Sequence, residues 1–211
     1  MKNSTGRSID YWGYSMADLA EALALTLDNE GHYGGDPWGG ETYRGIARVY
    51  HPDWPGWMEI DPVVARCEGD VGKINAALRK MHHLNAEVAN FYAREFWAPL
   101  NLASISRQTV ANKIFDIAVM SGHRRAGRTF QHALNALNAN QKYYRDIAVD
   151  GKIGPKTIVA LESCLQSGRR AEDINELMHV IFGHFLYEQT QRIPEKETVL
   201  LGWIRRSRRV I

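Results

Sequence analysis

The chain has 211 residues, of which 45% are hydrophobic and 24% charged, and its formal net charge is +2. This is the composition of an ordinary globular protein with enough residues for one large or two small domains. The net charge is too small to indicate a nucleic-acid partner. No apolar run approaches the roughly 20 residues that span a bilayer, so we expect no membrane insertion.

An apolar helical pattern near the N-terminus ends at Glu30. Leu23, Leu27 and Glu30 follow one another at i, i+4 and i+7, which puts Glu30 on the buried stripe if the helix persists that far. Partial desolvation would raise the pKa of this carboxyl group, as a general acid in glycoside hydrolysis requires. The alternative is a helix capped at Gly31 with Glu30 solvated at its end.

The stretch after Glu30 is unusually rich in glycine. Six glycines lie between positions 31 and 45, together with Asp36, Pro37, Trp38, Glu41 and Thr42. Glycine costs a folded chain backbone entropy, so this density indicates a loop in unusual dihedral angles or in close contact with a ligand.

Four blocks of sequence resemble one known family. The first runs Glu30-Gly31-x-Tyr33, then Asp36-Pro37, then Gly39-Gly40-x-Thr42-x-x-Gly45-Ile46. It resembles the signature of glycoside hydrolase family 108, lysozyme-like muramidases from phages and bacteria, some of them labelled secretion activator proteins. The other blocks are a Phe-Asp helix and Ser-Gly turn with a following Gln, an Asp-Gly-x-x-Gly-x-x-Thr turn similar to peptidoglycan-binding modules, and a Gly-Trp-x-x-Arg ending, at residues 115–137, 150–157 and 202–206.

The resemblance implies a set of site residues. The glutamate of the family motif is the catalytic acid, which corresponds to Glu30. The order Glu, Asp, Thr also resembles that of T4-type phage lysozymes, where an Asp and a Thr position the water. The implied catalytic residues are therefore Glu30, Asp36 and Thr42, and the implied substrate-binding residues are Tyr33, Trp38, Gly39, Gly40 and Glu41. For the second catalytic group the loop also offers Glu41, and it has one Asp-Pro unit where relatives often have two, so the identity of the second carboxylate stays open.

The remaining elements are predicted to be helical. Ser15, with Asp18, is expected to cap the first helix, and a single long helix is expected over 70–97, stopped by Pro99. Gly122 ends a helix over 107–121, and Pro155 opens one over 155–166. Further helices are expected over 125–137 and around 174–185, and strand signals are weak. We expect an all-α, lysozyme-like fold with a glycine-rich active-site loop, in which a catalytic half (1–100) and a helical peptidoglycan-binding-like half (101–211) pack as one unit.

Several conspicuous side chains allow two interpretations. Trp38, Trp54 and Trp57 either form an aromatic wall for sugar rings or plug the underside of the loop. Asp116, on an apolar helix face, is expected to be a structural hydrogen-bond partner that holds the loop, rather than a catalytic residue.

No metal or cofactor is expected. The His82-His83 pair has no second ligand pair at helical spacing, and no His-Glu-x-x-His motif occurs. Cys67 and Cys164 are more simply two free thiols than a disulfide, which stays open.

The predicted function is hydrolysis of the β-1,4 bond between N-acetylmuramic acid and N-acetylglucosamine in bacterial peptidoglycan, with Glu30 as general acid. The alternatives are a lytic transglycosylase that uses the same glutamate and a non-catalytic wall-binding or secretion-related protein. The first residues contain no signal-peptide pattern. We therefore expect synthesis in the bacterial cytoplasm and action on the wall after holin-type or other release.

Overall fold

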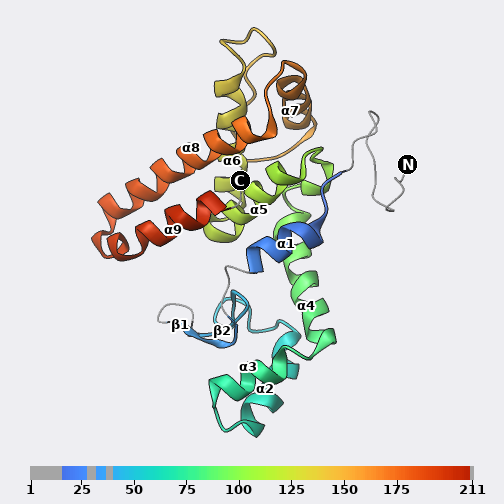
Figure 1. Ribbon diagram of the computed structural model, residues 1–211, viewed down its shortest axis with the longest axis vertical. Coiled ribbons are helices and arrows are strands. Elements are labelled where there is room, and N and C mark those ends of the chain that lie inside the picture. Colours follow the sequence, from blue (N-terminus) through green and yellow to red (C-terminus); the bar gives the residue numbers. More distant parts are fainter. Residues whose placement is uncertain (1–15, 28–31, 37–39, 210–211) are drawn as a thin grey trace. The chain divides into compact units, whose positions relative to one another are not determined.

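The structure, a computed structural model, describes residues 16–27, 32–36 and 40–209 (Figure 1). These residues divide into two compact units. The sheet unit consists of the described residues of Leu23–Glu95, and the helical unit consists of the described residues up to Ala22 together with those from Phe96 onward.

The sheet unit combines a small antiparallel sheet with short helices. Its strands are β1 (Gly34–Asp36), β2 (Gly40–Tyr43) and β3 (Ile46–Ala47), in the order β1-β2-β3. They follow α1 (Leu19–Leu27) and precede α2 (Gly56–Arg66), α3 (Val71–Leu78) and α4 (His82–Tyr92), which runs into a π-helical turn, η1 (Ala93–Trp97).

Aromatic side chains form the core beneath the sheet. The ring of Trp54 stacks on Tyr43, with 6.3 Å between centroids, and meets Trp57 and Phe91 edge-on. Trp54 and Trp57 are only 4% and 3% exposed. A Cβ on Gly56 would overlap the Trp54 ring, so the ring fits only against glycine. The plug interpretation is therefore confirmed for Trp54 and Trp57, while Trp38 lies outside the described residues.

The prediction of one helix over 70–97 is wrong. The chain forms α3 and α4 with a break at Met81, whose backbone is extended (φ −90°, ψ 93°). No proline or glycine marks the break, and the apolar spacing continues across it. Because α2 packs against both α3 and α4, the bend lets both short helices bury their apolar faces on α2. Tertiary packing overrides the local pattern here.

The start of α1 differs in detail from the expectation. The cap is the Asp18 carboxylate, which accepts a hydrogen bond from the backbone N–H of Ala20 at 2.7 Å. It satisfies one of the free N–H groups at the helix start. Ser15, the expected cap, lies outside the described residues.

The helical unit is built around α5 (Gln108–Ser121), in which every residue from Val110 to Ala118 is buried. Helices α6 (His123–Leu137), α8 (Ala171–Arg192) and α9 (Glu197–Arg209) pack against it, and α7 (Pro155–Gln166) packs on α6. Short 3-10 turns, η2 and η3, lie at Leu102–Ser104 and Pro194–Lys196. In Figure 1, α8 and α9 run side by side. The helices predicted over 107–121, 125–137 and 155–166 are confirmed, including the stop at Gly122, where φ is +81°.

A buried polar cluster joins three helices of this unit. Arg206 of α9 donates from Nε and Nη2 to Oδ1 of Asp116 at 3.0 Å, and Asp116 is fully buried in α5. The ammonium of Lys113, one turn earlier and also fully buried, donates to the Ser207 carbonyl. His179 of α8 contacts the Ser207 hydroxyl at 3.0 Å. Asp116 is thus a structural partner, as predicted, but these hydrogen bonds connect it to Arg206 of α9 and not to the loop.

The predicted fold class is confirmed, because the described chain is predominantly helical. Like the break between α3 and α4, the small sheet was not predicted from the sequence. None of the helices in the described ranges is both long and apolar enough to cross a membrane. Both cysteines, Cys67 and Cys164, are free thiols.

Candidate functional site

The glycine-rich segment forms the hairpin of β1 and β2 in the sheet unit. Gly34 lies opposite Thr42 and Asp36 opposite Gly40 in the antiparallel register. Gly40 has φ +64°, a conformation that glycine adopts at no steric cost and that suits the return of the hairpin. Of the predicted site residues, the structure describes Tyr33, Asp36 (its backbone), Gly40, Glu41 and Thr42. The others, Glu30, Trp38 and Gly39, lie outside the described residues.

The start of the hairpin is tied to α3. The backbone N–H of Tyr33 donates to Oδ1 of Asn75 at 2.7 Å, and Nδ2 of Asn75 donates to the Tyr33 carbonyl at 3.0 Å. This reciprocal pair satisfies both backbone groups of Tyr33, as a neighbouring strand would. The chain is therefore fixed to the helix three residues after Glu30.

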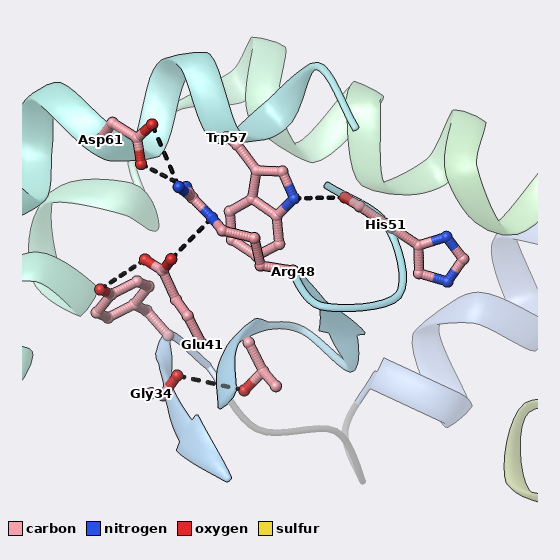
Figure 2. A network of polar contacts seen from close by, with 8 residues as sticks. Gly34, Glu41, Arg48, His51, Trp57 and Asp61 are labelled. Carbon is pink, nitrogen blue, oxygen red and sulfur yellow. Dashed lines mark hydrogen bonds and ion pairs between the residues drawn. The ribbon is translucent and has the colours of Figure 1, made fainter. Parts of the chain in front are cut away.

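A polar network then braces the hairpin against α2 (Figure 2). The hydroxyl of Tyr33 donates to Oε1 of Glu41 at 2.8 Å, and Oε2 of Glu41 forms an ion pair with Nε of Arg48 at 2.8 Å. The same guanidinium forms an ion pair with Asp61 on α2 and lies 4.4 Å from the centre of the Trp57 ring. Both oxygens of Glu41 are thus engaged within the sheet unit.

The network sets the protonation state of Tyr33. Burial, together with the hydrogen bond to Glu41, raises the pKa of Tyr33 to about 12. The hydroxyl therefore stays protonated at neutral pH and acts as a hydrogen-bond donor rather than a base. This geometry gives Tyr33 and Glu41 a structural role. Their predicted contacts to substrate stay a prediction.

Thr42 occupies the middle strand and is partly exposed. Its hydroxyl lies 3.4 Å from the Gly34 carbonyl, at the limit of a hydrogen bond. Because this contact is weak, the hydroxyl keeps most of its capacity to bind water or a ligand.

Arg48 and Asp61 are the residues of this network that the sequence did not indicate. They are 13 positions apart, and no helical or strand spacing links them. The only signal was a charge of each sign beside a glycine-rich segment, which is too common to be informative.

Of the histidine pair, His83 contacts a carboxylate of α2. Nδ1 of His83 contacts Glu59 at 2.6 Å, and this hydrogen bond raises the pKa of His83. Among the residues that the structure describes, no group of three or more His, Cys, Asp or Glu side chains lies close enough to hold a metal ion.

In the helical unit, Gln131 forms hydrogen bonds with the Asp-Gly turn that was recognised in the sequence at residues 150–157. Its Oε1 accepts the N–H of Gly151 at 2.8 Å, and its Nε2 donates to the Asp150 carboxylate at 2.9 Å and to the Lys152 carbonyl at 3.0 Å. The hydrogen bond from Gln131 lowers the pKa of Asp150. Two motifs that are about 20 residues apart thus form one structure.

The backbones of α6 and of the Asp-Gly turn also lie in close contact. A Cβ on Gly127 of α6 would collide with the carbonyl of Gly151, whose own φ is +87°. Beside the turn lies a cavity of about 370 Å³, lined by residues of the turn and of α7 together with Gln131. Its size is that of a small-ligand pocket.

These observations define the class of protein: it is predominantly helical, has a lysozyme-like fold and contains a braced glycine-rich hairpin. A solved structure, Brucella abortus SagA, shares the fold, with a TM-score of 0.58 and 20% identity over 91% of this chain and 90% of that chain. Residues 23–122 match the family model described as glycosyl hydrolase 108, and residues 125–208 match a predicted peptidoglycan domain. Most of the chain is therefore similar to these two families, one after the other, which confirms the resemblance found in its motifs.

No curated protein matches the chain. The two family matches support a protein that acts on peptidoglycan and has peptidoglycan as its partner.

Proposed function

We propose that the protein is a peptidoglycan muramidase that hydrolyses the β-1,4 bond between N-acetylmuramic acid and N-acetylglucosamine, with Glu30 as general acid. The observation that carries the proposal is the glycosyl hydrolase 108 match over residues 23–122, which includes Glu30 and the whole glycine-rich hairpin. The predicted peptidoglycan domain that follows it supports the wall polymer as substrate.

The hairpin supports the second half of the reaction. Hydrolysis needs a group that activates water or stabilises the oxocarbenium-like carbon, besides the acid that protonates the leaving oxygen. Alternate pairs of an antiparallel ladder share a face, so the register puts positions 36 and 42 on one face of the sheet. We assign Asp36 and Thr42 to positioning the attacking water on that face.

The brace beneath the hairpin supports rigidity, which catalysis of this kind requires. The Tyr33–Asn75 pair holds the N-terminal side of the hairpin, and the Glu41–Arg48 ion pair holds its second strand. A site held within a few tenths of an ångström loses less free energy to reorganisation at the transition state.

The test is digestion of purified peptidoglycan by the wild-type protein and by Glu30→Gln, with the products identified by mass spectrometry. Glu68→Gln is the matched control, because Glu68 is exposed and lies between α2 and α3. We expect reducing-end muramic acid from the wild type and the control, and a rate lower by about 10²–10⁴-fold from Glu30→Gln.

Each other result has a definite meaning. Full activity of Glu30→Gln would remove the proposed acid. Anhydromuramic ends would make the protein a lytic transglycosylase, and wall binding without cleavage by the wild type would leave a binding protein. Asp36→Asn and Thr42→Val should each lower kcat more than they raise KM. If both variants cleave at the wild-type rate, the assignment of the water-positioning residues is wrong.

A further inference from the structure

The helical unit contains a second cavity, of about 380 Å³, that the glycine-rich hairpin and the Asp-Gly turn do not line. Its walls are Ser121 at the end of α5, the arginines Arg124, Arg125 and Arg128 in the first two turns of α6, and Phe185 of α8. Three of the five lining side chains are therefore cations, and no carboxylate lines the cavity.

The positive charge of this cavity is poorly compensated. None of the three arginines forms an ion pair with a carboxylate in the described part of the chain. Glu188 opposes the charge of Arg125 from α8, yet it is paired with His184 at 3.6 Å, and Arg192 of the same helix adds a further positive charge. Burial and the neighbouring arginines lower the pKa of Arg125.

The arginines also lie at the N-terminal end of α6, which adds to the positive charge around the cavity. The N-terminal end of a helix carries a partial positive charge, so cations in the first turns of α6 are locally unfavourable. An anion at this end would be stabilised both by the helix and by the guanidinium groups. The cluster is thus an arrangement that a bound anion would satisfy.

One arginine is already oriented for such a ligand. The guanidinium of Arg125 lies 3.7 Å from the centre of the Phe185 ring. Stacking on an aromatic face fixes the plane of a guanidinium and leaves its N–H edge free to donate in parallel to two oxygens of one carboxylate. The Ser121 hydroxyl adds a neutral donor beside it.

We propose that this arginine cavity binds a carboxylate group of the peptidoglycan stem peptide. Arg125, Arg128 and Phe185 all lie within residues 125–208, which match the predicted peptidoglycan domain. The glycan strand is nearly neutral in its sugars and carries its negative charge on the carboxylates of its peptides. A cavity of about 380 Å³ has room for one such carboxylate with its amino-acid residue. The inference rests on the wall polymer as partner but not on cleavage by Glu30.

The experiment is a calorimetric titration with a disaccharide tetrapeptide from peptidoglycan, and with the same molecule after amidation of its carboxylates. The background variant Glu30→Gln is used throughout, so that the probe is not cleaved and a failure of the proposed reaction leaves this measurement unaffected. The double variant Arg125→Gln/Arg128→Gln is compared with a control, Arg145→Gln. The control removes the charge of an exposed arginine outside the cavity.

We expect the free carboxylate form to bind about tenfold more tightly or better than the amidated form, corresponding to one or two charge-assisted hydrogen bonds. The double variant should lose this preference and the control should keep it, while thermal melting shows that all variants are folded. Added salt should weaken binding of the free form to the control but not to the double variant.

Three results would overturn the proposal. They are equal affinity for the free and amidated forms, an unchanged preference in the folded double variant, and no binding of the probe at all. Parallel titrations with inorganic phosphate and with phosphatidylglycerol vesicles identify the competing ligands. A loss confined to phosphate or vesicle binding in the double variant would reassign the cavity to that anion.

Discussion

Asp116 and Arg206 are 90 positions apart in the sequence and form a hydrogen-bonded ion pair at 3.0 Å, with both Nε and Nη2 of Arg206 donating to one carboxylate oxygen. The carboxylate has no exposure to solvent, and the Arg206 side chain is 19% exposed. The pair joins α5, the most buried helix of the helical unit, to α9. Two blocks of the motif pattern therefore meet in one interaction.

Removing the guanidinium should destabilise the protein strongly. Arg206→Leu leaves the Asp116 carboxylate buried without its cation, which typically costs about 3–5 kcal/mol. Arg205→Leu on the same helix removes an exposed arginine and should change the free energy of unfolding by less than about 0.5 kcal/mol. Urea unfolding of the three proteins measures both values. Equal effects of the two substitutions would show that the Asp116–Arg206 pair does not stabilise α9.

A second pair of variants tests the close contact between α6 and the Asp-Gly turn. Gly127→Ala puts a methyl group against the Gly151 carbonyl and should cost about 3 kcal/mol through displaced backbone. Gly202→Ala places the same methyl group in open space on α9 and should stabilise the protein by up to about 1 kcal/mol. The midpoint temperature of thermal unfolding should fall for Gly127→Ala and rise for Gly202→Ala. A neutral Gly127→Ala would mean that the turn can move away from α6.

The tyrosine of the hairpin provides a prediction about pH. Tyr33→Phe removes the hydrogen bond to Glu41 and should cost about 1 kcal/mol at neutral pH. The pKa of Tyr33 is raised to about 12 from 10.0, so its contribution is complete below pH 10 and is lost as the pH rises through 12. The loss of unfolding free energy caused by Tyr33→Phe should therefore become smaller as the pH rises from 10 through 12. Tyr50→Phe is the control, because Tyr50 is 70% exposed. A deficit that does not change with pH would contradict the coupling to Glu41.

Buried Lys113 should show the opposite pH dependence. Burial lowers its pKa from 10.5 to about 8, although Asp116 and Glu176 act in the other direction. Between pH 8 and pH 10 the unfolded chain binds more protons at this group than the folded one, so stability rises with pH. Across this range we expect the free energy of unfolding of the wild type to rise by on the order of 2 kcal/mol relative to that of Lys113→Met. Denaturation midpoints of both proteins at several pH values give the difference, and a constant difference would place the pKa of Lys113 near its ordinary value.

Much of the fold could be predicted because its signals are local. Gly122 and Pro155 mark helix boundaries through their own backbone preferences, and the apolar spacing of α8 indicates its buried face. The break between α3 and α4 could not be predicted, because its cause is the surface of α2 and not any residue at Met81. The sheet was missed since its strands are two to four residues long and two of them contain glycine, which lacks a strand signature.

The motif that marks the candidate site is visible in the sequence, but the geometry around it is not. The motif around Glu30 and Thr42 depends on residue types at fixed spacing and is visible in the sequence alone. The brace is not, because Asn75 of α3 meets Tyr33, and Asp61 of α2 meets Arg48, only once the unit has folded. Gln131 is an intermediate case. Its motif was visible, and its contact with the Asp-Gly turn depends on the approach of α6 that Gly127 permits.

The pairing of Gly127 with Gly151 also bears on how this domain can be engineered. The eight-residue turn with its aspartate and glycines is not a portable module, because its backbone is completed by Gln131 and by a helix whose surface is bare at position 127. A graft onto another wall-binding scaffold would have to carry α6, the turn and the start of α7 together. A transplanted turn alone would meet a side chain where this protein has none.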